Sequence, residues 1–179
     1  YIYEYSLEQE PGFLESYEKV SELFTRLQQK FVDIRKRIVK FHHGTHTKLF
    51  CIPTTSGTGS EVTPYAVITD DNTHVKYPLT DYEMTPQVAI VDPEFVMTVP
   101  KRTVAWSGLD TLSHALESYV SVMASDFTRP WSLQAIKLVF ENLEKSYNYD
   151  PKNPTLEGET ARENMHYAAT LGGMAFANA

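Results

Sequence analysis

The sequence predicts an α/β segment followed by an all-α segment, with the change near Pro100. Before Pro100, short apolar runs are separated by turn residues and preceded by one long amphipathic run, a pattern typical of mixed α/β structure. After Ser107, apolar residues recur at helical spacing only. Apolar residues make up 42% and charged residues 22% of the 179 positions, which is the balance of a folded globular protein.

The charge and cysteine content exclude several classes of protein. Sixteen basic and twenty-three acidic residues give a net charge of −7, which argues against nucleic-acid binding. No run approaches the ~18 apolar residues of a membrane span, so no membrane partner is predicted. The single Cys51 excludes internal disulfides and indicates a reducing, cytoplasmic compartment. Because Tyr1 is not an initiator Met, we expect these residues to be part of a longer chain.

The first long element is an amphipathic helix predicted over residues 14–40. Its apolar positions, three, four or seven apart in the later part, are Leu14, Val20, Phe24, Leu27, Phe31, Ile34 and Ile38. We interpret this stripe as core packing rather than a coiled coil, because the run is short. The segment that follows contains His42, His43 and His46 around Gly44, and we interpret it as a solvated loop rather than a metal site.

Short strands are predicted between this helix and Pro100. Residues 49–53 have the pattern of a short buried strand. Residues 66–69 and 74–78 flank the turn 70–72, which predicts a hairpin. Residues 88–91 are apolar on both faces, as expected of a strand covered on both sides of a sheet.

Three helices are predicted after this region, over about 107–123, 131–147 and 157–178. The second is expected to bury one apolar face, made of Leu133, Ile136, Phe140, Leu143 and Tyr147. The third is rich in Ala and Gly, which permits close helix–helix approach and predicts burial in a bundle. His166 on this helix is expected to cap or to pack.

A loop of small and hydroxylated residues, 54–62, follows the first predicted strand. Its glycines, Gly57 and Gly59, allow a ligand to approach the backbone, and its hydroxyls and N–H groups suit phosphate or amide groups. It is neither a Rossmann fingerprint, since Val62 stands where a third Gly is needed, nor a Walker A loop, since no Gly-Lys-Ser/Thr follows. A tight surface turn with hydroxyl caps explains the residues equally well.

Asp110 and His114 stand four residues apart on the first of the three helices, which places both on one face. A carboxylate with an imidazole is an oxygen–nitrogen pair suited to iron or zinc. Ser107 and Asp110 also form a Ser-x-x-Asp capping pattern, with His114 as an ordinary packed residue. From these residues alone, the capping interpretation is favoured.

Several motifs in correct order resemble the iron-dependent (group III) alcohol dehydrogenases. They are Thr54-Thr-Ser-Gly-Thr-Gly-Ser-Glu-Val-Thr63, Val67-Ile-Thr-Asp70, Lys76-Tyr-Pro78, Ala89-Ile-Val-Asp-Pro93 and Gly108-Leu-Asp-x-x-x-His-Ala-x-Glu117. Residues 33–38, 117–122 and 176–179 are similar to the alcohol dehydrogenase half of the bifunctional aldehyde–alcohol dehydrogenases. On this resemblance, Asp110 and His114 become metal ligands.

The resemblance implies an incomplete piece of the two-domain, dehydroquinate-synthase-like fold of this family, with the active site between the domains. Residues 1–100 would be the C-terminal part of the α/β NAD-binding domain, and residues 101–179 the first helices of the α-helical metal-binding domain. The family's Gly-Gly-Gly-Ser loop, its two further histidine ligands and its catalytic histidine would lie outside these residues. No complete catalytic set is therefore expected, and the isolated chain is predicted to be inactive.

The resemblance also implies which residues bind NAD and metal. Thr54, Thr55 and Thr58 would line the nicotinamide and phosphate end of NAD, with Ser56, Gly57, Val67 and Lys76 close to the cofactor. Asp110 and His114 would supply two ligands of Fe²⁺, or of Zn²⁺ as the alternative. The implied reaction is the fermentative reduction of acetaldehyde to ethanol by NADH, with the metal polarising the carbonyl.

The resemblance leaves other functions open. Another metal-dependent dehydrogenase of this kind would act on butanol or a diol instead of ethanol. A lyase of the dehydroquinate-synthase type shares the architecture but not the threonine-rich loop. A non-enzymatic assembly piece is the third alternative, because full-length bifunctional relatives form filaments. A homo-oligomer or filament is therefore the expected assembly.

Overall fold

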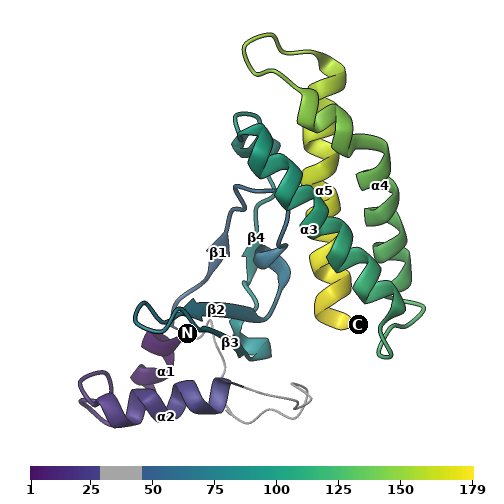
Figure 1. Cartoon of the computed structure of the whole chain (residues 1–179). Helices are drawn as coiled ribbons and strands as arrows, with labels where there is room; N and C mark the ends of the chain where they lie inside the picture. The colour runs from purple at the N-terminus through teal and green to yellow at the C-terminus, as the bar shows by residue number, and fades with distance from the viewer. Residues whose placement is uncertain (29–45) are drawn as a thin grey trace. The chain divides into compact units, whose positions relative to one another are not determined.

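The computed structural model describes residues 1–28 and 46–179, and divides the chain into two compact units (Figure 1). One unit comprises residues 1–50 and 64–87, and the other residues 51–63 and 88–179. The loop 54–62 and the segment 88–100 therefore belong to the same unit as the helices that follow Pro100. The predicted domains, 1–100 and 101–179, stay a prediction. His42, His43 and the C-terminal part of the predicted first helix lie outside the described residues.

In the first unit, two helices and a hairpin share a small core. The helices are α1 (Ile2–Leu7) and α2 (Tyr17–Leu27), and the strands are β2 (Tyr65–Thr69) and β3 (Lys76–Thr80). Ser16 caps α2 by accepting a hydrogen bond from Lys19 N. The buried members of this core are Phe13, Leu23, Leu27 and Leu79. The predicted amphipathic helix is thus confirmed as a core-packing element over α2, which begins later than expected.

The hairpin confirms its prediction. Strands β2 and β3 are antiparallel, with a register from Tyr65 opposite Thr80 to Thr69 opposite Lys76. Asp70 closes the turn, because its Oδ1 accepts from Asn72 N at 2.8 Å and its carbonyl from His74 N at 2.7 Å. His74 has the positive φ of 56° that such a turn needs.

The strands predicted at 49–53 and 88–91 are present but short, as β1 (Phe50–Cys51) and β4 (Val88–Ala89), and they pair with one another. The prediction that they are buried is wrong. Phe50, Ile52, Val88 and Ile90 are all exposed. Within the described residues the two strands form a sheet of only two, so no further strand shields their apolar side chains.

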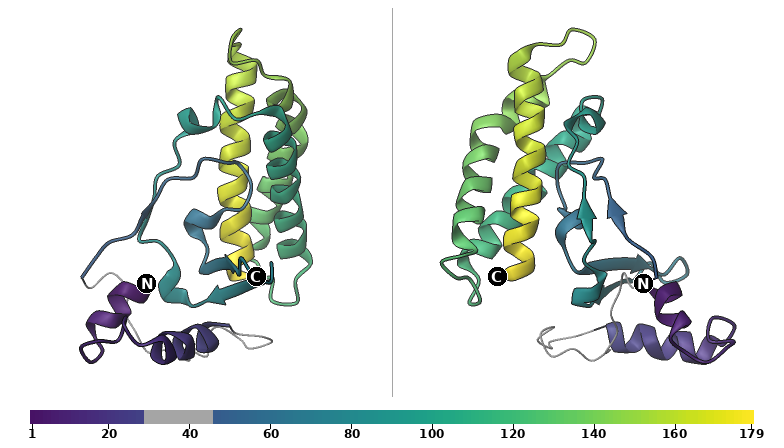
Figure 2. Two further views of the ribbon diagram at one scale, coloured as in Figure 1. Left: turned by 60° about the vertical axis from the view of Figure 1, so that its left-hand side comes forward. Right: turned by 180° about the vertical axis from the view of Figure 1, so that it is seen from behind.

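The second unit is dominated by three helices that all pack against one another (Figure 2). They are α3 (Lys101–Val120), α4 (Arg129–Asn148) and α5 (Leu156–Asn178), and they confirm the three predicted helices. Three short 3₁₀ helices complete the described elements. The second unit contains η1 (Ser60–Val62) and η3 (Pro93–Val96), and the first unit contains η2 (Tyr82–Met84). None of the helices in the described ranges is long and apolar enough to cross a membrane.

The face of α4 that the sequence predicted to be buried is largely exposed. Leu133, Phe140 and Tyr147 are exposed, Phe140 to 76%. The buried face consists instead of Ser132, Ala135, Val139, Asn142 and Ser146. These side chains are mostly small, which allows α4 to lie close to its neighbours. The spacing of the large apolar residues is helical as predicted, but their stripe is turned part-way around the helix from the buried face, so Leu143 still packs against the core while Phe140 does not.

The small residues of α5 are buried, as predicted. Ala161, Ala168, Ala169, Gly172, Gly173 and Ala175 all lie in the interior. These small side chains allow other parts of the chain to pack closely against α5. At Gly173 the closely packed neighbour is a loop and not a helix. A Cβ atom placed on Gly173 would lie 2.9 Å from the backbone of Gly59 in the loop 54–60.

Candidate functional site

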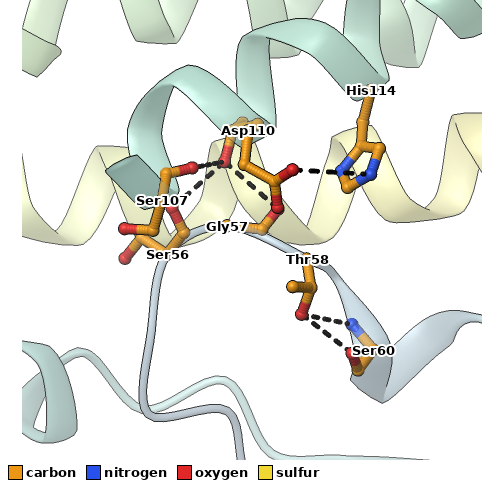
Figure 3. A network of polar contacts seen from close by, with 8 residues as sticks. Ser56, Gly57, Thr58, Ser60, Ser107, Asp110 and His114 are labelled. Carbon is orange, nitrogen blue, oxygen red and sulfur yellow. Dashed lines mark hydrogen bonds and ion pairs between the residues drawn. The ribbon is translucent and has the colours of Figure 1, made fainter. Parts of the chain in front are cut away.

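The loop 54–60 lies in the second unit, held against α3 and α5 (Figure 3). A Cβ atom on Gly57 would lie 2.8 Å from Ser107 Cβ on α3, closer than real Cβ atoms approach. Gly59 has a φ of +60°, and a Cβ atom there would lie 2.7 Å from Gly173 Cα on α5. The two glycines therefore let the loop backbone touch both helices, whereas the sequence predicted either close approach of a ligand or a tight surface turn.

Thr111 attaches the loop to α3. Its side chain is fully buried, and its Oγ1 lies 3.1 Å from the carbonyl oxygen of Ser56 and 3.3 Å from that of Gly57. The same hydroxyl lies 3.2 Å from Ser107 O within the helix. The hydroxyl of Thr111 thus connects the loop backbone to α3, directly beside Asp110.

A second set of contacts attaches the loop and η1 to α5. Ser56 Oγ lies 3.1 Å from His166 Nδ1, and Thr170 Oγ1 donates to the buried Glu61 carboxylate at 2.7 Å. Burial lowers the pKa of His166, although the negative charges of Glu61 and Asp92 oppose that shift. The imidazole is therefore neutral near pH 7.

The hydroxyl groups that the sequence assigned to the cofactor differ in exposure. Thr54, Thr55 and Thr58 are exposed, whereas Ser56 is half-buried and Gly57 is buried. Thr58 Oγ1 bonds the Ser60 hydroxyl at 2.8 Å, so it caps the loop locally (Figure 3). The loop therefore has a buried side that contacts the helices and an exposed side that presents threonines.

Asp110 and His114 lie on one face of α3, with Oδ1 of Asp110 3.9 Å from Nε2 of His114 (Figure 3). The side chains are 43% and 22% exposed, so both are reachable from solvent. The capping interpretation is wrong, because α3 begins at Lys101 with Pro100 as its N-cap. Ser107 lies inside the helix and directs its hydroxyl to Val104 O.

The two side chains fit a shared metal ion. Iron or zinc binds oxygen and nitrogen ligands at about 2.0–2.2 Å, so one ion can reach two atoms up to about 4 Å apart. The ring of His114 is fixed by Phe176, at 4.9 Å between ring centroids, which leaves Nε2 facing the carboxylate. Across residues 1–28 and 46–179, no group of three or more His, Cys, Asp or Glu residues could hold a metal. Within those ranges, Asp110 and His114 are thus a pair of possible donors without a third beside them.

Two of the predicted cofactor residues belong to the other unit. Val67 lies on β2 and Lys76 on β3, and both are exposed. Their role at the cofactor stays a prediction. The second unit brings together the loop residues 54–58 with Asp110 and His114.

Two family models match the chain in consecutive segments. The model for iron-containing alcohol dehydrogenase matches residues 19–93. The model for the C-terminal part of the Fe-containing alcohol dehydrogenase family matches residues 104–179, which include Asp110 and His114. The chain belongs to the iron-containing alcohol dehydrogenase family. This membership confirms the resemblance found in the motifs.

Relatives of this family include bifunctional enzymes. The chain is 58% identical over 164 residues to aldehyde-alcohol dehydrogenase 2 of Entamoeba histolytica, and 53% identical to the bifunctional aldehyde-alcohol dehydrogenase of Escherichia coli. Both alignments cover 91% of this chain and 18% of the relative. It is also 45% identical over 152 residues to the NADPH-dependent butanol dehydrogenase of Clostridium saccharobutylicum, covering 85% of this chain and 37% of that protein. The chain therefore spans well under half the length of these relatives.

Solved structures of iron-containing alcohol dehydrogenases confirm the fold. The enzyme from Thermococcus thioreducens superposes with a TM-score of 0.67 at 35% identity, over 90% of this chain and 42% of that one. The sulfoacetaldehyde reductase of Bifidobacterium kashiwanohense, solved in complex with NAD⁺, gives 0.66 at 36% identity, over 74% of this chain and 36% of that one. The predicted order of two domains and the incompleteness of the piece stay predictions.

Sequence analysis missed the residues that hold the loop of this family member in place. No sequence pattern marks Thr111 or Thr170, and Glu61 enters only as one position of the motif 54–63. His166 was correctly expected to pack, but its partner Ser56 lies 110 positions away in the sequence. No local spacing signals such a pair, since only the approach of α5 to the loop creates it.

Proposed function

We propose that the complete protein carrying this chain is an NAD- and iron-dependent alcohol dehydrogenase that reduces acetaldehyde to ethanol. We further propose that this activity is one half of a bifunctional aldehyde–alcohol dehydrogenase, as in the relatives from Entamoeba histolytica and Escherichia coli. The observation that supports this best is the pair Asp110 and His114, 3.9 Å apart on the helix that also holds the loop 54–60.

Each side of the site has a proposed task. Asp110 and His114 hold the metal, which supplies Lewis-acid polarisation of the aldehyde carbonyl when it is bound. Thr54, Thr55 and Thr58 offer exposed hydroxyls to the nicotinamide and phosphate end of NAD(H). Ser56 and Gly57 support this cofactor surface from its buried side, and Val67 and Lys76 are proposed to lie near the cofactor. The neighbour solved with NAD⁺ supports this choice of cofactor.

We propose iron as the bound metal, with zinc as the alternative. A carboxylate with an imidazole accepts either ion, so the donors alone do not choose between them. The family models are those of iron-containing enzymes, which supports Fe²⁺. Two donors are fewer than the three that a catalytic site commonly draws from the protein, so we propose that further ligands come from outside these residues.

A second candidate substrate class is a longer alcohol. The 45% identity to a butanol dehydrogenase that uses NADPH supports it. Comparing acetaldehyde, butyraldehyde and a hydroxyaldehyde as substrates, with NADH and with NADPH, separates these functions. The preference that supports our proposal is for acetaldehyde with NADH. A preference for butyraldehyde would instead support the butanol candidate.

The proposed metal role is tested with the complete protein, prepared without oxygen and loaded with Fe²⁺ or Zn²⁺. Asp110→Asn and His114→Gln are expected to lower bound metal and to abolish acetaldehyde reduction, while NADH binding persists. Asp126→Asn is the matched control, because Asp126 is fully exposed and pairs only weakly with Arg129, at 3.7 Å. Full metal content and activity in the Asp110 and His114 variants would overturn the assignment.

The 179-residue piece by itself is proposed to be inactive, because it offers only two metal donors. Acetaldehyde reduction by the purified piece would contradict this. We propose that the complete protein assembles into a homo-oligomer or filament in the cytoplasm. Light scattering with and without NAD and iron tests the assembly, including the alternative that the piece retains only a contact surface.

A further inference from the structure

Ser56 and His166 form a contact that the proposed chemistry does not use. Ser56 Oγ lies 3.1 Å from Nδ1 of His166, so the loop is joined to α5 through side chains. His166 is only 1% exposed, and its Nε2 has no hydrogen-bond partner among the described residues. The imidazole therefore lies in the interior, attached to the buried side of the loop.

A buried imidazole with one unsatisfied nitrogen is an unfavourable choice for a core position. Leaving a polar atom unpaired in the interior costs stability, and an apolar side chain of similar size would avoid this cost. Met165 and Ala168, its neighbours on α5, are apolar core residues. His166 differs from these two residues by its hydrogen bond to Ser56. We therefore attribute the presence of a histidine at this core position to that hydrogen bond.

The bond determines how the loop presents its exposed side. A serine side chain has three staggered orientations, and the contact with Nδ1 selects the one directed at α5. Thr111 holds the carbonyl groups of Ser56 and Gly57 from α3. With Ser56 fixed on both sides, the neighbouring Thr54, Thr55 and Thr58 are left exposed.

We propose that His166 is a positioning residue for NAD(H): through Nδ1 it fixes Ser56, and thereby the loop conformation in which the exposed threonines meet the cofactor. This inference rests on the proposed function of the loop. His166 itself touches neither cofactor nor substrate in this proposal. Its effect should therefore appear in cofactor affinity and vanish when Ser56 lacks its hydroxyl.

The direct test is a double-mutant cycle in the complete, metal-loaded protein, with NADH affinity measured by fluorescence titration. Ser56→Ala and His166→Leu are each expected to weaken NADH binding about three- to tenfold, the value of one hydrogen bond. In the Ser56→Ala background, His166→Leu should weaken binding less than about twofold further. Equal effects of His166→Leu in both backgrounds would overturn the proposal.

A conservative variant separates positioning from a general packing role. His166→Asn keeps a polar atom near the place of Nδ1 and should retain NADH affinity within about twofold. The KM for NADH should rise in His166→Leu, whereas kcat at saturating NADH, the KM for acetaldehyde and the metal content should stay near those of the parent. Tyr167→Phe is the matched control on the same helix, because Tyr167 is exposed and donates to Glu163.

Failure of this inference differs from failure of the proposed function. If the parent protein binds no NADH, the proposed function itself is wrong. If the parent binds NADH but His166→Asn is as weak as His166→Leu, or His166→Leu binds as well as the parent, only the positioning role is wrong. Should His166→Leu not fold, Ser56→Ala and His166→Asn alone decide: the proposal requires weaker NADH binding in the first and near-parent binding in the second.

Discussion

The imidazole of His114 directs Nε2 toward Oδ1 of Asp110, 3.9 Å away and one helical turn earlier on α3. The other ring nitrogen, Nδ1, is buried without a hydrogen-bond partner among the described residues, and the ring rests against Phe176. Because one helix carries both side chains, their spacing is fixed before the cation that we propose can bind.

Metal removal should separate chemistry from cofactor binding. In the complete protein, a chelator is expected to lower acetaldehyde reduction by at least about 100-fold, since a Lewis acid contributes several kcal/mol at the transition state. NADH binding should change less than about threefold, because the contacts of Thr111 and His166 hold the loop without the metal. Fe²⁺ added back should restore activity. Unchanged activity after verified metal removal would contradict the metal role.

Two adjacent glycines on α5 should respond in opposite ways to alanine. Gly173→Ala places Cβ 2.9 Å from backbone atoms of Gly59, which cannot move aside as a side chain can, and should destabilise the protein by about 1–3 kcal/mol. Gly172→Ala meets nothing closer than 3.6 Å and should be neutral or stabilising by about 0.5–1 kcal/mol. The midpoints of thermal unfolding check both. Equal midpoints would show that the loop does not touch α5 closely.

Thr111→Val should loosen the loop from α3. Valine has the same shape but leaves the carbonyl groups of Ser56 and Gly57 without this donor, at an expected cost of about 1–3 kcal/mol. Thermal unfolding should show this loss, and NADH titration should show weaker binding. Thr111→Ser keeps the hydroxyl and serves as the matched variant. The NADH affinity of Thr111→Ser should be closer to that of the parent than the NADH affinity of Thr111→Val is. The reverse order would contradict the hydrogen-bonding role of Thr111.

Stability should depend on pH through His166. Burial lowers the pKa of its imidazole in the folded state below the value of about 6.5 expected when unfolded. Between these two values the unfolded chain binds more protons, so stability rises with pH across that window and falls as the pH drops below about 6.5. The stability advantage of the parent over His166→Asn should therefore shrink from pH 7 to pH 5. A constant difference would show that His166 does not titrate differently on folding.

Arg162 should be sensitive even to lysine. Its buried guanidinium donates to Val96 O at 2.8 Å and to Val99 O at 3.2 Å, and lies 5.4 Å from the centre of the Tyr149 ring. Arg162→Lys loses the planar fork that reaches both carbonyls, and Arg162→Met leaves them unpaired. We expect losses of about 1–3 kcal/mol in thermal unfolding. Arg129→Met, at an exposed ion pair, should change stability by less than about 1 kcal/mol.

Local patterns in the sequence predicted much of the secondary structure. The hairpin of β2 and β3 and the helices α3, α4 and α5 follow from residue spacing and turn residues within a few positions of each other. The i,i+4 spacing likewise placed Asp110 and His114 on one face of α3. What local patterns did not reveal is which side of a helix meets the core, as the exposed Phe140 on α4 shows.

The sequence by itself determined the elements, the family and the pairing of a carboxylate with an imidazole, because each depends on neighbouring residues or on ordered motifs. Only the tertiary structure decided that Gly57 and Gly59 touch helices, that small residues form the buried face of α4, and that His166 meets Ser56. These contacts join residues far apart in the chain. They exist because helices and loop approach each other closely in space, and spacing along the sequence carries no record of that approach.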